Sequence, residues 1–105
     1  FGLDTLDLIA KYRVDLAFIG AGGISEQGDF TDYTRLAAEQ RAQMAAAAKA
    51  TYVLADHTKF SKRTPVTIPI SSPISALITD RLPKGEPAVE ASARRWTIKV
   101  AGPKK

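Results

Sequence analysis

The stretch Asp15-Leu-Ala-Phe-Ile-Gly-Ala-Gly-Gly-Ile-Ser25 decides how the rest of the chain is interpreted. Residues 14–19 form a nearly continuous apolar run of strand length, which is typical of a strand covered on both faces of a parallel sheet. Gly20, Gly22 and Gly23 follow at once, and glycines at a strand end let the backbone approach another group closely. That group could be a nucleotide, a smaller phosphate or a neighbouring segment of the chain.

Apolar runs and helical patterns alternate along the remaining sequence. Further strands are expected at residues 51–55, 76–79 and 97–100, and prolines limit the segment between the first two to a loop with at most an edge strand. Helix-forming composition and periodicity predict helices at residues 3–13, 33–49 and 86–94. The alternation predicts an α/β fold with a mostly parallel sheet flanked by helices.

Details of the long helix and of the aromatic residues are also predicted. Thr31 or Asp32 is expected to cap the helix at residues 33–49. The helix face that carries Met44 is expected in the core. The aromatic residues Phe18, Tyr33 and Phe60 are expected to be packing residues.

The strand ends are where a ligand is expected, because parallel sheets bind ligands outside the carboxyl ends of their strands. Residues 20–25, residues 56–59 and Asp80 all leave such ends. Backbone N–H groups of the glycine run could hold an anion or a sugar. Asp56 could accept hydrogen bonds from sugar hydroxyls, and Lys59 could neutralise a phosphate. A glycine turn that serves chain geometry alone remains the alternative.

Composition excludes several classes of function. The chain has 105 residues, one domain at most, and its hydrophobic content of 45% is ordinary for a soluble globular fold. It has no cysteine and only one histidine, His57, so no disulfide, metal site or cofactor is expected, and a reducing cytoplasm fits. No apolar stretch is long enough to span a membrane. The net charge of +4 is dispersed, which argues against nucleic-acid binding by this segment alone.

The glycine run does not match the dinucleotide-binding fingerprint G-x-G-x-x-G. Ser25 occupies the third glycine position, and Gly28 and Asp29 keep the chain in a loop where the helix should begin. The next strand ends only at Asp56, so the acidic residue expected about 20 positions on is missing. A nicotinamide or flavin site is therefore not expected.

Three motifs carry a resemblance to a known family. They are F-I-G-A-x-G-I at residues 18–24, L-A-D-x-x-K-F at residues 54–60 and I-T-D at residues 78–80. In this order and spacing the chain resembles the C-terminal effector-sensing domain of DeoR-family transcriptional repressors, over nearly its whole length. The resemblance implies a truncated sensor domain of the ribose-5-phosphate isomerase/CoA-transferase-like fold. The winged helix-turn-helix domain and the first sensor strands are expected to lie upstream of residues 1–105, outside this chain.

The related isomerase shows whether to expect an enzyme or a sensor. Its strand ends in D-G-A-D-E, whereas the matching residues here are Ile19-Gly-Ala-Gly-Gly23, which lack all three acids. Its lysine-glycine loop has no counterpart in residues 26–33, but its D-x-S-K element matches Asp56-His-Thr-Lys59. Proton abstraction needs a positioned base, so binding without turnover is expected and no residue is assigned a catalytic role.

The resemblance therefore implies a sugar phosphate effector that controls operator DNA binding by the attached domain, in a cytoplasmic homo-oligomer. The ligand-binding residues are expected to be Gly20, Ala21, Gly22, Gly23, Glu39, Asp56 and Lys59. Lys62 has no counterpart in the motif. A sugar-phosphate isomerase-like enzyme that uses Glu39 and Asp56 is the alternative, and a domain that acts only by oligomerising is a third.

Overall fold

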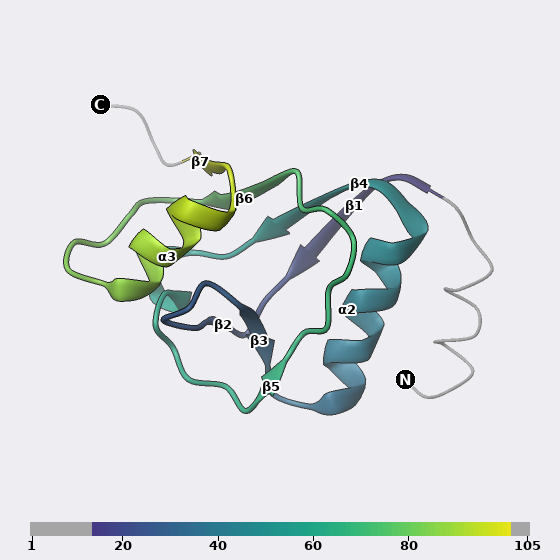
Figure 1. The fold of residues 1–105 in the computed structure, drawn as a ribbon, viewed down its shortest axis with the longest axis horizontal. Coiled ribbons are helices and arrows are strands. Elements are labelled where there is room, and N and C mark those ends of the chain that lie inside the picture. The colour runs from purple at the N-terminus through teal and green to yellow at the C-terminus, as the bar shows by residue number, and fades with distance from the viewer. Residues whose placement is uncertain (1–13, 102–105) are drawn as a thin grey trace.

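The structure, a computed structural model, describes residues 14–101, so the helix expected at residues 3–13 lies outside the described residues. The described elements alternate as the sequence predicts (Figure 1). In chain order they are β1 (Val14–Gly20), β2 (Gly23–Ile24), β3 (Phe30–Asp32), α2 (Arg35–Ala47), β4 (Ala48–Leu54), a 3-10 turn (His57–Lys59), β5 (Val66–Thr67), β6 (Ala76–Thr79), α3 (Pro87–Arg95) and β7 (Ile98–Val100).

The larger of two sheets has the strand order β1-β4-β6-β7, and all its neighbouring strands are parallel. Gly20 is in register with Leu54, and Leu54 with Ile78, so the carboxyl ends of three strands form one edge. The smaller sheet, β2-β3-β5, is antiparallel. The α/β fold with a mostly parallel sheet is confirmed, and the proline-rich segment contributes only the short edge strand β5.

The core lies between one face of the large sheet and a layer formed by α2, α3 and the small sheet. Ile19, Val53 and Leu77 are adjacent on neighbouring strands and are at most 2% exposed. Ala38 of α2 and Ala88 of α3 pack in the same core cluster as these three residues. Their small side chains let the helices lie close to the sheet. Burying side chains of this size contributes about 1.5–3 kcal/mol each, so Leu77→Ala would remove a substantial part of the stability of a small domain.

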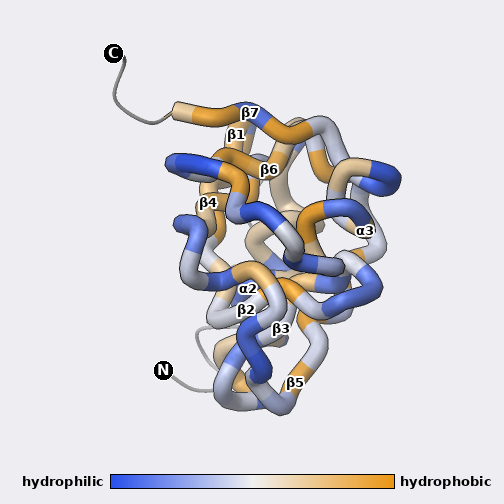
Figure 2. The backbone as a smooth tube through the Cα atoms, turned by 90° about the vertical axis from the view of Figure 1, so that its left-hand side faces the viewer, coloured by the Kyte–Doolittle hydropathy of each residue, from blue (hydrophilic) through white to orange (hydrophobic). Residues whose placement is uncertain are grey.

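The opposite face of the large sheet is apolar but uncovered by any described residue. Leu16 and Phe18 are each 53% exposed, and Leu54 is 43% exposed. Figure 2 shows the apolar residues running through the strands of this sheet. The expectation that residues 14–19 are covered on both faces is therefore wrong for the described part of the chain. Side chains alternate between faces, and α2 and α3 pack against only one of them.

The start of α2 also corrects the sequence interpretation. Thr31 and Asp32 belong to β3, and the capping residue is Thr34, whose side chain accepts a hydrogen bond from the Ala37 N–H. Met44 is 37% exposed, so its helix face is not the core face; alanines and Gln40 are buried instead. No described helix has the length and hydropathy that a membrane crossing requires.

Candidate functional site

The carboxyl edge of the large sheet brings the predicted loops together. The loop after β6 is tied to the loop after β4 by the Asp80 carboxylate. It accepts hydrogen bonds from the His57 backbone N–H at 2.7 Å and interacts with His57 Nδ1 at 2.8 Å. The His57 side chain, by hydrogen bonding, lowers the pKa of Asp80 to about 2. The edge is thus cross-linked by a carboxylate that stays ionised at neutral pH.

Asp56 has a local structural role at this edge. Its carboxylate caps the 3-10 turn by accepting hydrogen bonds from the Thr58 hydroxyl and from the Thr58 N–H at 2.9 Å. These bonds lower the pKa of Asp56. Asp56 and Asp80 line a shallow cavity of about 240 Å³ at the ends of β4 and β6. The side chain of Asp56 is exposed, so the cavity stays open to a ligand.

The glycine run brings two backbone segments into close contact. Gly22 N–H donates to the Thr31 carbonyl at 2.8 Å, and Gly23 pairs with Thr31 between β2 and β3. A Cβ atom at Gly23 would lie 2.4 Å from the Lys62 carbonyl oxygen. The chain therefore needs a residue without a side chain at position 23. Gly22 and Gly23 are also buried, as is Ala21, whereas Gly20 is partly exposed.

A lysine cluster lies beside the glycine run, and we define it as Tyr33, Lys59 and Lys62. Lys62 Nζ is 5.6 Å from the centre of the Tyr33 ring. Hydrogen bonding between them lowers the pKa of Tyr33 and raises that of Lys62, and Lys59 contributes to both shifts. The Tyr33 ring lies 3.2 Å from the position a Cβ would take at Gly22. The cluster thus gathers two lysines around the Tyr33 phenol, whose ring lies next to Gly22.

Sequence reasoning found Lys59 but missed the other two members of the lysine cluster. Tyr33 was expected to be a packing residue; its ring lies against Gly22, but it is 55% exposed and also belongs to the lysine cluster. Phe18 is exposed as well, whereas Phe60 is buried as expected. The spacing of Lys62 three residues after Lys59 was the available signal, because a tight turn can bring residues at this spacing to the same side.

Glu39 lies apart from Asp56 and the lysine cluster. It forms an ion pair with Arg35 at 3.0 Å and lines a pocket of about 250 Å³ against Pro69 and Ser71. That pocket contains neither Asp56 nor the lysine cluster. The structure therefore does not bring Glu39 into a cavity with the other predicted residues.

Arg41 fixes the start of the glycine run against α2. Its Nε donates to the Gly20 carbonyl at 2.7 Å and lies 3.1 Å from Oδ2 of the buried Asp32. Arg41 thus connects α2, the glycine run and β3. Across residues 14–101, His, Asp and Glu side chains do not gather in threes in a way that would hold a metal ion.

Comparison with known proteins identifies relatives of this chain. Residues 1–81 match the family described as the DeoR C-terminal sensor domain. The chain is 35% identical over 83 residues to the HTH-type transcriptional repressor GlcR of Bacillus subtilis, covering 79% of this chain and 32% of that protein. It is 30% identical over 80 residues to the HTH-type transcriptional regulator IolR of the same organism, covering 76% of this chain and 32% of that protein.

A third relative carries a more specific name. The glycerol-3-phosphate regulon repressor of Haemophilus influenzae is 26% identical over 84 residues, which cover 80% of this chain and 33% of the repressor. The chain thus spans about a third of the length of these curated relatives. No solved structure matches it significantly.

Proposed function

This chain belongs to the family of DeoR C-terminal sensor domains, and we propose that it is the effector-binding part of a bacterial repressor of sugar metabolism. Its effector would be a sugar phosphate, bound at the carboxyl edge of the large sheet. The observation that carries this proposal is the lysine cluster beside the glycine run. The name of one relative, the glycerol-3-phosphate regulon repressor, refers to a phosphorylated polyol and supports the same class of ligand.

The chemistry of the edge suits such a ligand. Lysine ammonium groups neutralise a phosphate as point charges, and two of them beside each other favour its dianionic form. Neither Lys59 nor Lys62 forms an ion pair with a carboxylate in residues 14–101, so their charge is available. The exposed oxygens of Asp56 could accept hydrogen bonds from sugar hydroxyls, and the Nε2 atom of His57 remains unused by Asp80.

We propose binding without turnover. The position of the first isomerase carboxylate is occupied by Ile19, which is 2% exposed in the core. Glu39, the alternative base, is ion-paired with Arg35. The effector would then act by binding one arrangement of the sensor more tightly than another, and an attached winged helix-turn-helix domain would respond at operator DNA. Such a repressor would work in the cytoplasm, where the chromosome lies, as a homo-oligomer.

Isothermal titration of glycerol 3-phosphate and other sugar phosphates into the full-length protein tests this proposal. Lys59→Ala should weaken the affinity by about 10- to 150-fold, since a charge-assisted hydrogen bond is worth roughly 1.5–3 kcal/mol. Lys62→Ala should weaken it as well, because the structure places Lys62 in the same cluster.

Lys49→Ala is the matched control. Lys49 is an exposed lysine near the start of β4, paired with Asp15 at 3.5 Å, and such surface pairs contribute little. Its affinity should equal that of the wild type. Unchanged affinity in Lys59→Ala would remove the lysine cluster from the site, and no binding of any sugar phosphate would refute the ligand class.

A further inference from the structure

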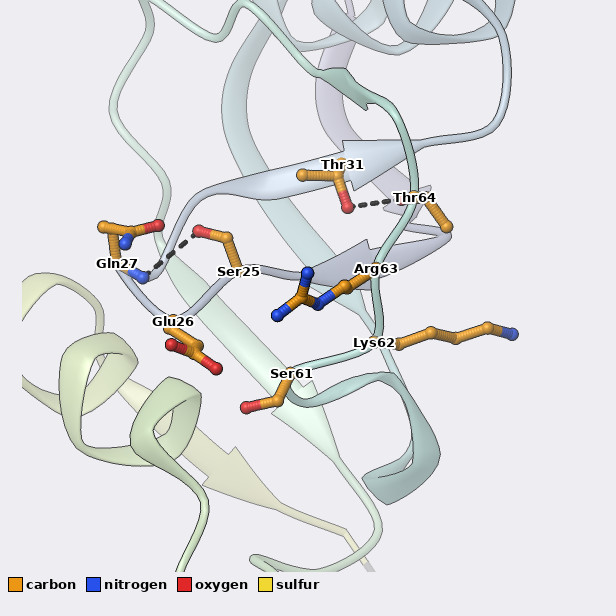
Figure 3. A pocket seen from close by; sticks show the side chains of 8 residues that line it. All are labelled: Ser25, Glu26, Gln27, Thr31, Ser61, Lys62, Arg63 and Thr64. Atoms are coloured by element: carbon orange, nitrogen blue, oxygen red, sulfur yellow. Dashed lines mark hydrogen bonds between the residues drawn. The ribbon is translucent and has the colours of Figure 1, made fainter.

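A second polar pocket lies on the other side of the segment that carries Lys62. It has a volume of about 380 Å³ and is lined by Ser25, Glu26, Gln27, Thr31, Ser61, Lys62, Arg63 and Thr64 (Figure 3). Arg63 points toward the loop of Ser25 and Glu26, whereas the Lys62 side chain points away from it. Of the residues assigned to the effector site, Lys62 alone lines this pocket.

The hydroxyl groups of this pocket have protons to donate. Ser25 Oγ accepts hydrogen bonds from the Gln27 N–H at 3.2 Å and the Asp29 N–H at 3.0 Å, so its own proton is uncommitted. Thr31 and Thr64 share a single hydrogen bond between their hydroxyls, which leaves one of their two protons free. Each of these groups can therefore donate to an occupant of the pocket.

A buried hydroxyl at the wall also lacks a partner. Ser61 Oγ is buried and makes no hydrogen bond to any described residue. Leaving a buried polar group unsatisfied costs about 1–3 kcal/mol. Ser61 also adopts a left-handed backbone conformation with φ of 62°.

Arg63 supplies the positive charge. Its guanidinium carries donors in a fork that matches the oxygens of a phosphate or carboxylate. Within residues 14–101 it forms no ion pair. The one carboxylate at the pocket belongs to Glu26, which is exposed. Donors therefore outnumber acceptors among the lining side chains.

Both walls of the pocket are held in place before anything binds. On one side, Arg95 contacts the Asp29 carboxylate at 2.6 Å and Trp96 Nε1 donates to the Gly28 carbonyl at 3.0 Å, which anchors the loop that follows Ser25. On the other side, Ser61 N–H donates to the Ile24 carbonyl at 2.8 Å. A prebuilt pocket loses little conformational entropy on binding.

We propose that this pocket is a second anion site, which binds the phosphate group of a small hydroxylated phosphate monoester. Arg63 and the hydroxyls of Ser25 and the Thr31–Thr64 pair hold the phosphate oxygens, because a phosphate offers more acceptor positions than a carboxylate to so many donors. Glu26 repels a bare anion and accepts a hydrogen bond from a hydroxyl of the monoester. The pocket shares Lys62 with the lysine cluster, but the Lys62 side chain points away from it, so this site goes beyond the proposed effector site.

Inorganic phosphate is the probe. It is titrated calorimetrically into the full-length protein carrying Lys59→Ala and Lys62→Ala, which removes the cations of the lysine cluster. One phosphate should still bind. Adding Arg63→Met should weaken it at least about tenfold, the loss of one charge-assisted contact. Adding Arg81→Met, an exposed arginine away from the pocket, should change nothing. Adding Glu26→Gln should tighten binding, because a repulsive charge is removed.

Three results would overturn the proposal. They are no phosphate binding in the double-lysine variant, an unchanged affinity with Arg63→Met, and a weaker affinity with Glu26→Gln. A separate titration of the sugar phosphate effector distinguishes the two sites. Arg63→Met alone should keep effector affinity within about twofold. A loss as large as that of Lys59→Ala would show that the pocket belongs to the effector site, whereas failure of effector binding alone would leave the second site intact.

Discussion

The variant Gly23→Ala distinguishes two possible roles of the glycine run, which are close backbone packing and contact with a ligand. The added Cβ would lie 2.4 Å from the Lys62 carbonyl oxygen, 3.0 Å from Thr31 Oγ1 and 3.2 Å from the Lys62 carbonyl carbon. Ordinary contact begins near 3.4 Å, so the backbone at Lys62 must move by about 1 Å. Two of these three neighbours are backbone atoms, so no rotamer change relieves the clash.

The free-energy cost of that backbone movement can be estimated from other cases in which extra atoms are forced into a packed site. Extra atoms forced into a packed site destabilise a protein by about 1–3 kcal/mol. For a protein of 150–250 residues each kcal/mol lowers the unfolding midpoint by about 2–4 °C, so Gly23→Ala should lower it by about 2–12 °C. The shift also displaces Lys62 and Arg63, so anion affinity should fall together with stability.

Gly20→Ala is the matched control in the same run. A Cβ there would meet only Arg41 Nη2 at 3.9 Å, an ordinary contact. Its unfolding midpoint should be unchanged or slightly raised, because alanine reduces the entropy of the unfolded chain. Thermal unfolding of both full-length variants, followed by circular dichroism, makes the comparison. Equal midpoints would refute the close-approach explanation, and a loss of effector affinity without a loss of stability would assign Gly23 to ligand contact instead.

Three further predictions concern other parts of the fold. Thr34→Ala should cost about 0.5–2 kcal/mol in denaturant unfolding and Thr34→Ser much less, because serine keeps the oxygen that caps α2. Asp80 has a pKa depressed from 3.8 to about 2, so its contribution to stability is present above pH 3.8 and is lost as pH falls through about 2. The difference in unfolding midpoint between wild type and Asp80→Asn should therefore close over that range, and a constant difference would contradict this. The full-length protein should not turn over ribose 5-phosphate, and turnover that Glu39→Gln abolishes would revive the isomerase interpretation.

The strands of the large sheet were predictable because buried strands appear in the sequence as short runs of apolar residues. Apolar runs of strand length located β1, β6 and β7 within a residue or two. The start of β4 was missed because residues 48–50 are Ala-Lys-Ala, good helix formers, and pairing with β1 overrides that preference. The short strands β2 and β3 were missed because two or three residues carry no periodicity.

The candidate site was predictable only where motif spacing determined it. Lys59 and Asp80 follow strand ends, and parallel topology carries them to one edge. The approach of Lys62 to Tyr33 joins segments nearly thirty residues apart, so no local pattern contains it. The position of Glu39 depends on the rotation of α2 about its axis. That rotation is set by the buried alanines rather than by any charged residue.

The junction between α2 and β4 has a mechanical consequence. The helix ends at Ala47 and the strand begins at Ala48, so no loop separates them. The helix starts two residues after Tyr33, and β4 returns to the turn that carries Lys59, so both ends of this helix–strand unit reach the lysine cluster. Because no loop intervenes, a displacement of Tyr33 would be transmitted along about 20 Å of helix. It would reach the point where Ala48 pairs with Val14, at the opposite edge of the sheet.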